Sequence, residues 1–83
     1  MDTLTIPNST LSDLIKKLTP RQMEIIKHLA EGQSNKQTGR MLGIGHEAIR
    51  KNVNKACKRA GVENRIQLIV LYAQWWATEG KEQ

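Results

Sequence analysis

Hydrophobic residues recur at helical spacing in several stretches of the chain, and glycines separate these stretches. Gly32, Gly43 and Gly61 each follow an apolar run and suit the left-handed backbone conformation that ends a helix. No two segments show the alternating pattern of a pair of strands. The pattern therefore predicts an all-α fold with these glycines at helix ends.

Polar residues mark where the predicted helices begin. Thr19 and Gln22 are three residues apart around Pro20, so their side chains can cap a helix reciprocally while proline takes its first position. Ser34 and Gln37 repeat this capping pattern. With these starts and the glycine ends, we expect four helices, at residues 20–30, 34–42, 46–60 and 64–78.

The predicted helix 46–60 has two contrasting faces. One face carries an apolar stripe at helical spacing: Ile49, Val53, Ala56, Cys57 and Ala60. The other face is basic and carries an amide: Arg50, Lys51, Asn54, Lys55 and Lys58. A short helix, a tight glycine-containing turn and a helix of this kind are typical of a helix-turn-helix.

Upstream of these helices, four apolar residues follow the i, i+3, i+4, i+7 pattern of a helix face: Leu11, Leu14, Ile15 and Leu18. We expect a short extra helix at 11–17 that docks on the core or on a partner. The chain then divides into an N-terminal extension (1–17), a helix-turn-helix domain (18–78) and a tail (79–83) that is expected to fray.

The charge distribution points to an acidic partner. The chain has 13 Lys and Arg residues against 8 Asp and Glu residues, which gives a formal charge of +5 at pH 7. Residues 36–65 hold eight basic residues and only two acidic ones, Glu47 and Glu63, so this segment alone carries +6. Such a segment favours nucleic acid as a partner, although a solvated basic face has the same composition.

Other classes of protein are disfavoured by what the sequence lacks. It has no apolar run long enough for a membrane span and no signal peptide, so we expect a cytoplasmic protein that is nucleoid-associated when bound to DNA. Cys57 is the single cysteine and cannot form an internal disulfide or build a zinc site by itself. We expect no metal, no other cofactor and no enzyme activity, because no catalytic constellation is present.

The basic face of helix 46–60 supplies the candidate base contacts. In a helix-turn-helix the second helix lies in the major groove, where Arg and Lys donate to guanine and Asn pairs with adenine. Arg50 and Asn54 project one turn apart with Lys51 beside them, and we expect these three to contact base edges. Glu47 could accept from cytosine, or could repel phosphate and orient Arg50.

Other polar residues are placed to hold the DNA backbone. Lys55 and Lys58 lie toward the flanks of the recognition helix, and His46 stands near its start. Ser34, Asn35 and Lys36 lie at the start of a helix, where a phosphate is electrostatically favoured. His46 could contact a phosphate, or could be a plain exposed residue that needs no partner.

Four separated motifs resemble the LuxR/FixJ-type helix-turn-helix family. They are Leu18-Thr19-Pro20-Arg21-Gln22, Ala30-Glu31-Gly32-Gln33-Ser34-Asn35-Lys36, Leu42-Gly43-Ile44 and Gly61-Val62-Glu63-Asn64-Arg65. The resemblance covers about residues 18–73 and implies a four-helix domain that binds DNA as a homodimer. It places base contacts at Arg50, Lys51 and Asn54, and backbone contacts at Asn35, Lys36, Asn52 and Lys55.

The chain departs from the family pattern at several positions. Gln22 replaces the usual Glu and keeps the capping geometry, whereas Ala48 replaces a common Thr and removes a hydroxyl that could contact phosphate. Asn52 stands where His is frequent. These changes bear on the DNA sequence that is bound more than on the fold. We expect no receiver or ligand-sensing domain within these 83 residues.

The predicted helix 64–78 is apolar on two sides, so one small core cannot cover both. One face holds Ile66, Ile69, Val70, Ala73 and Ala77, and the opposite face holds Leu68, Leu71, Tyr72 and Trp75. We expect the second face to meet a second copy of the chain, or alternatively the Leu11–Leu18 segment.

The sequence therefore favours a homodimeric transcription regulator that binds double-stranded DNA. One alternative is an interaction protein that forms heterodimers with larger LuxR-type regulators and antagonises them. Another is a promoter-binding module like region 4 of a sigma factor, which the long apolar helix after Asn64 disfavours. RNA polymerase would be a further partner of a regulator, and the sequence does not distinguish an activator from a repressor.

Overall fold

The structure, a computed structural model, describes residues 8–79 and contains five helices and no strand within that range. The helices are α1 (Asn8–Lys16), α2 (Pro20–Ala30), α3 (Asn35–Leu42), α4 (His46–Ala60) and α5 (Arg65–Thr78). The predicted all-α fold and its four main helices are confirmed. The extra helix also forms and begins three residues earlier than predicted. The remainder of the N-terminal extension and the tail after Glu79 lie outside the described residues.

The predicted caps define where the helices begin and end. The Thr19 hydroxyl accepts from the Gln22 amide at 3.1 Å, and the Gln22 side chain accepts from the Thr19 amide at 3.1 Å. Ser34 and Gln37 form the same reciprocal pair at 3.1 and 2.9 Å. At the other ends, all three predicted glycines have a positive φ: Gly32 (93°), Gly43 (74°) and Gly61 (74°).

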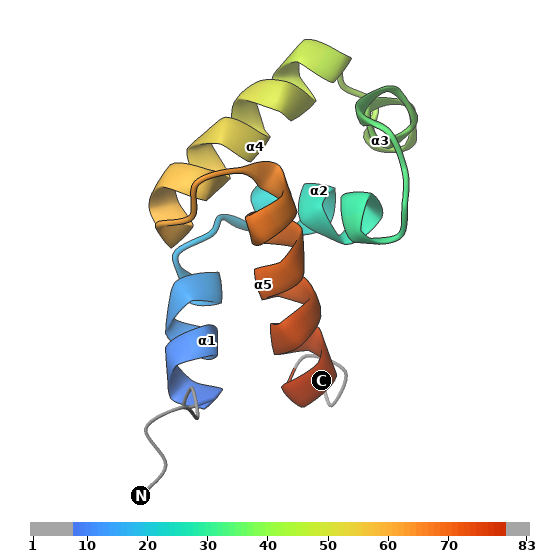
Figure 1. Ribbon diagram of the computed structural model, residues 1–83. Helices are drawn as coiled ribbons and strands as arrows, with labels where there is room; N and C mark the ends of the chain where they lie inside the picture. Colours follow the sequence, from blue (N-terminus) through green and yellow to red (C-terminus); the bar gives the residue numbers. More distant parts are fainter. Residues whose placement is uncertain (1–7, 80–83) are drawn as a thin grey trace, which may run out of the picture.

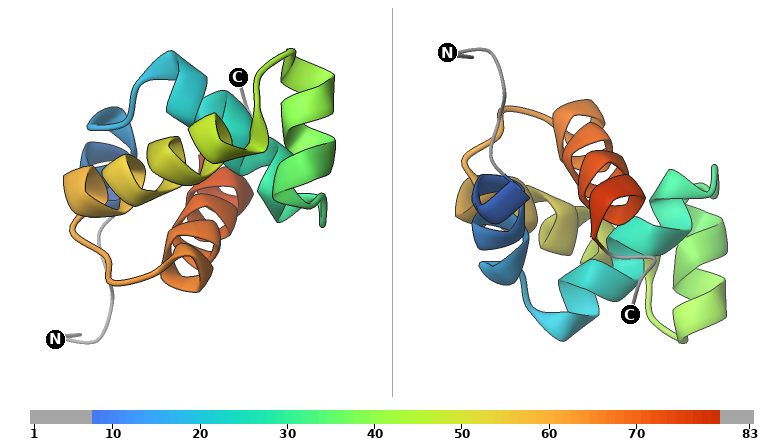
Figure 2. Two further views of the ribbon diagram at one scale, coloured as in Figure 1. Left: turned by 90° about the horizontal axis from the view of Figure 1, so that it is seen from above. Right: turned by 90° about the horizontal axis from the view of Figure 1, so that it is seen from below.

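The helices enclose one core. α1 and α5 lie side by side and run in opposite directions, and α4 lies across the end of the pair (Figure 1). Views from above and below show α3 beside the N-terminal half of α4, at the far end from α1 (Figure 2). The predicted inner face of α4 is confirmed, because Ile49, Val53, Ala56, Cys57 and Ala60 are all buried.

The orientation of α5 corrects the sequence-based expectation. Leu68, Leu71 and Tyr72 are buried in the core of the single chain, and Trp75 packs against that core half-buried. These four residues were expected at a dimer contact. Instead, they share a cluster with apolar residues of α1, which is the alternative partner that the sequence left open. The opposite face is the one left exposed at Ile66, Val70, Ala73 and Ala77, whereas Ile69 is half-buried against the core.

Gly39 permits a close approach between α3 and the turn that leads to α4. A Cβ atom at this position would lie 2.5 Å from the carbonyl oxygen of Ile44, whose amide donates to the Gly39 carbonyl at 2.9 Å. Backbone atoms form both sides of this contact, so the clash cannot be relieved by rotating a side chain. The packing of α3 on the turn therefore requires glycine here.

We expect Gly39→Ala to lower the free energy of unfolding by roughly 1–3 kcal/mol, because the added methyl must push the turn away from α3. Urea unfolding followed by circular dichroism measures this change. Gly45→Ser is the matched control, since a Cβ at Gly45 meets nothing within 4 Å and serine is a good helix cap. A Gly39→Ala protein as stable as the parent would contradict the assigned role.

Candidate nucleic-acid interface

The exposed side of α4 carries the three residues predicted to reach base edges, together with Glu47, whose role the sequence left open. Glu47, Arg50, Lys51 and Asn54 are all exposed, while their neighbours Ile49 and Val53 anchor the helix in the core. The helical repeat separates the two sets because the polar residues recur at intervals of three and four. The four candidates therefore lie together on one surface, as the sequence predicted.

Glu47 and Arg50 form an ion pair on this surface. Both Nε and Nη2 of Arg50 donate to Oε1 of Glu47, at 3.0 and 2.7 Å. The other carboxylate oxygen lies 3.6 Å from Nε2 of His46. Hydrogen bonding from Arg50, followed by its charge, lowers the pKa of the Glu47 carboxyl. Glu47 is thus a fixed negative charge within a basic surface.

The residues predicted to hold the DNA backbone occupy two places. His46, Lys55 and Lys58 are exposed on α4 with the base-reading candidates. Ser34, Asn35 and Lys36 lie at the start of α3, where Ser34 uses its hydroxyl as the helix cap. The backbone amides in this first turn remain a favourable environment for a phosphate.

Asn52 is engaged within α4 itself. Its Nδ2 donates to the carbonyl of Ala48 at 3.0 Å, and its side chain is half-buried. A side-chain amide that bonds its own helix in this way has one donor fewer for a phosphate. Asn52 therefore differs from the other candidates of α4, whose side chains are exposed.

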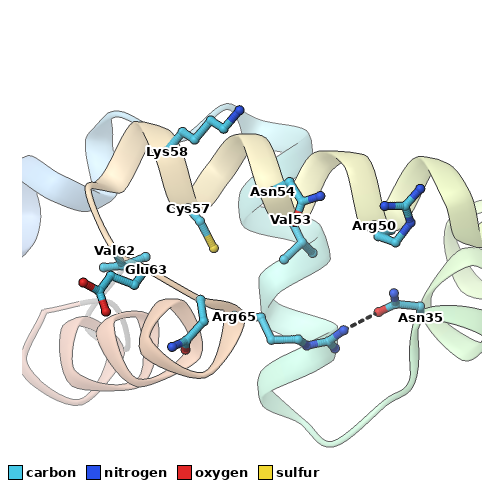
Figure 3. Close-up of a pocket in the computed structure, with 10 residues that line it drawn as sticks. Asn35, Arg50, Val53, Asn54, Cys57, Lys58, Val62, Glu63 and Arg65 are labelled. Atoms are coloured by element: carbon cyan, nitrogen blue, oxygen red, sulfur yellow. Dashed lines mark hydrogen bonds between the residues drawn. The ribbon is translucent and has the colours of Figure 1, made fainter.

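A hydrogen bond between α5 and α3 joins this surface to the rest of the domain. Arg65, at the start of α5, donates from Nη1 to Oδ1 of Asn35 at 2.9 Å. The bond crosses a groove of about 440 Å³ beside α4, into which the sulfur of Cys57 points (Figure 3). Sequence reasoning missed the role of Arg65, because a contact across 30 residues leaves no local pattern.

The Arg65–Asn35 bond also orients Asn35. The amide oxygen of Asn35 accepts from Arg65, so its Nδ2 remains available as the donor that a phosphate oxygen requires. Burial raises the pKa of the Cys57 thiol, with the nearby Arg65 charge opposing this shift. The groove floor is thus an uncharged thiol, and positive charge comes from its rim: Arg50, Lys58 and Arg65.

Residues 8–79 contain no group of three or more His, Cys, Asp or Glu side chains arranged to hold a metal ion. Over the same residues, no helix is both long and apolar enough to cross a membrane.

Comparison with known proteins identifies the family. Residues 16–72 match the model of bacterial regulatory proteins of the luxR family. The chain belongs to this family. Its members are transcription regulators that bind DNA through a helix-turn-helix domain, which agrees with the arrangement of α3 and α4 described above. Residues Asn8 to Ile15, most of α1, precede the match.

Curated relatives are longer proteins. YhjB of Escherichia coli (strain K12), named as an HTH-type transcriptional regulator, is 37% identical over 70 residues, covering 84% of this chain and 34% of that protein. The nitrate/nitrite response regulator protein NarP of the same organism is 27% identical, covering 75% and 29%. The glycerol metabolism activator of Pseudomonas putida is 29% identical, covering 70% and 26%. The chain thus spans about a third or less of these luxR-type relatives, and no solved structure matches it.

The ion pair on α4 makes a pH-dependent prediction. We expect the Glu47 carboxyl to titrate below the ordinary range of a glutamate, and Arg50→Ala to raise its pKa toward that range. Because folding lowers this pKa, the ion pair stabilises the folded state when the pH is above the ordinary pKa of a glutamate. This stabilisation is lost as the pH falls through the lowered pKa. Carbon-detected NMR titration of the Glu47 carboxyl measures its pKa in the parent and in the Arg50→Ala variant.

Lys51→Ala is the matched control for this titration. The charge of Lys51 also lowers the pKa of Glu47, but less than Arg50 does, so its removal should produce the smaller rise. An Arg50→Ala variant in which the Glu47 carboxyl titrates as in the parent would contradict the ion pair.

Proposed function

We propose that this chain binds specific sequences of double-stranded DNA as a homodimer and regulates transcription from the bound site. In this proposal α4 lies in the major groove. Arg50, Lys51 and Asn54 contact bases, and the start of α3 with Lys55 and Lys58 holds phosphates. The observation that carries the proposal is the exposed basic surface of α4, presented next to the start of α3.

The physical chemistry of that surface fits DNA better than a protein partner. Its side chains are long, exposed and mostly cationic, and those along α4 recur at each turn over a helix of 15 residues. Such a helix fits the width of the major groove, and its flanking lysines can neutralise phosphates on either side. A protein-binding surface would instead have an apolar centre.

The exposed face of α5 supports the dimer. Ile66 is 70% exposed, Val70 48% and Trp76 44%, and Ala73 and Ala77 lie exposed on the same stripe. A small protein rarely leaves a contiguous apolar stripe of this kind open to water. A second copy would cover it with an identical stripe around a two-fold axis, and small alanines at its centre would let the helices approach closely.

A two-fold dimer also suits the DNA. It would present two copies of α4 to successive major grooves and read a roughly palindromic site. Since DNA lies in the cytoplasm of bacteria, the proposal places the protein there. A larger LuxR-type regulator with a similar apolar stripe is the competing partner for α5, and RNA polymerase is the proposed target of the bound regulator.

The DNA part of the proposal predicts a steep dependence of affinity on salt. We expect selection from a random duplex pool to enrich a motif. The logarithm of the affinity for this motif should fall against the logarithm of the salt concentration with a slope of about −3 per protomer or steeper, because binding to phosphates releases counterions. Fluorescence anisotropy at several salt concentrations measures the slope. Lys58→Ala should weaken all sequences about equally and reduce the slope by about 1.

Lys16→Ala is the matched control, since Lys16 is an exposed residue in the last turn of α1 and its removal takes away the same charge outside the residues proposed to contact DNA. It should leave the slope unchanged. A parent protein with a slope near zero, or with no enriched motif, would overturn sequence-specific DNA binding.

The dimer part predicts opposite results for adjacent substitutions on α5. Val70→Glu puts a charge on the exposed stripe, so we expect a folded monomer with weaker operator binding. Leu71→Glu puts the same charge into the core, where Leu71 is 6% exposed, and should unfold the chain. Sedimentation velocity and circular dichroism distinguish the two outcomes.

Gln74→Glu is the control for added charge, because Gln74 is exposed on α5 at the edge of the apolar stripe. It should leave the dimer intact. A parent chain that stays monomeric at tens of micromolar, both alone and on its selected operator, would refute the homodimer.

A further inference from the structure

The way in which Glu47 holds Arg50 leaves one edge of the guanidinium available. Glu47 accepts from Nε and Nη2, which together form the inner edge of the group. The outer edge consists of the remaining N–H bonds on Nη1 and Nη2, and no residue in the range 8–79 accepts from Nη1 in this structure. Arg50 is therefore held by one edge and exposed by the other.

The outer edge has the geometry that guanine requires. Guanine presents two acceptors in the major groove, O6 and N7, and an arginine that approaches end-on donates to both. Adenine presents one acceptor beside a donor, thymine presents a single acceptor, and cytosine presents only a donor. An arginine fixed in this orientation distinguishes guanine, whereas a mobile arginine also binds the nearest phosphate.

We propose that Glu47 is a positioning residue that holds Arg50 for guanine, so that each half-site of the operator contains a guanine opposite Arg50. This inference rests on the proposed function, because it assigns one base within the DNA that α4 reads. Glu47 does not contact the base in this arrangement. Its carboxylate fixes the rotamer of Arg50 before DNA binds. The entropic cost of ordering this long side chain then no longer opposes binding.

The charge of Glu47 contributes in a second way. A carboxylate on the basic surface repels phosphates, so DNA that lacks the guanine gains less from approaching α4. Correct DNA offsets this repulsion through the two hydrogen bonds to Arg50. Glu47 thus weakens binding to all DNA sequences, but it weakens binding to the sequence with the guanine least. The ratio of specific to non-specific affinity therefore increases.

Two simpler roles for Glu47 make different predictions. An acidic residue in the first turn stabilises a helix without any role in binding, and its removal would then lower stability but leave base preference unchanged. Alternatively, Glu47 could accept directly from cytosine N4, and its removal would then change the preference for cytosine whether or not Arg50 is present.

The test uses the full chain and a random duplex pool. Sequences are selected with the parent protein and with Glu47→Gln, Glu47→Asp and Arg50→Lys, and with the double variant of Glu47→Gln and Arg50→Lys. Glu24→Gln is the matched control, because Glu24 also forms an i, i+3 ion pair, with Arg21 at 3.6 Å, but on α2. Thermal unfolding checks that each variant is folded.

We expect Glu47→Gln to reduce the preference for guanine at one position by about 5-fold or more, and to increase affinity for non-specific DNA. Glu47→Asp keeps the carboxylate and should keep more of the preference. Arg50→Lys should lose it, and adding Glu47→Gln to Arg50→Lys should change it no further, because the two residues act as one unit. Glu24→Gln should behave as the parent.

The failure of this inference is distinguishable from the failure of the proposed function. A parent that selects no sequence overturns the proposed function. A parent that selects a motif, with Glu47→Gln keeping the full guanine preference, leaves the proposed function standing and overturns the role of Glu47. A change in cytosine preference that persists in the Arg50→Lys background overturns it as well and assigns Glu47 a direct contact.

Discussion

The backbone contact between Gly39 and Ile44 sets the angle between α3 and α4, and the candidate interface depends on that angle. The short α3 packs directly on the turn, so α4 leaves the turn in one direction. The start of α3 and the polar face of α4 are thereby kept in a fixed relation to each other. DNA phosphates and base edges are also in fixed relation, which is why such a rigid unit can read both.

The hydrogen bond from Arg65 to Asn35 extends this rigid unit to α5. It connects the first turn of α3 to the first turn of α5 across the groove beside α4. The proposed dimer helix is therefore linked by a polar contact, as well as through the core, to the residues proposed to hold phosphate. Rotation between protomers about α5 would shift both copies of α4 as rigid bodies relative to DNA.

Sequence patterns were sufficient where polar and apolar positions contrast. The caps at Thr19 and Ser34 use contacts only three residues apart, and α4 has a single apolar stripe, so its exposed candidates could be named in advance. The bond from the amide of Asn52 to the carbonyl of Ala48 is a local choice that composition does not reveal. The Arg65 contact could not be predicted, since it depends on how α3 and α5 pack.

Helix α5 shows why periodicity alone cannot orient an element. Both of its faces are apolar, so the pattern of residues is satisfied equally well with either face inward. The core chooses the face with Leu68, Leu71 and Tyr72, because α1 supplies Leu11 and Ile15 to the same cluster. Most of α1 lies outside the stretch that matches the luxR family, so here a segment beyond the shared domain completes its core.

The two-sided character of α5 then has a consistent physical account. One face needs the cover of α2, α4 and α1, which pack on it within the chain. The other face remains apolar although Ile66 and Val70 are exposed on it. Burial within one chain therefore accounts for the first face only, and the apolar character of the second is what the proposed two-fold contact explains.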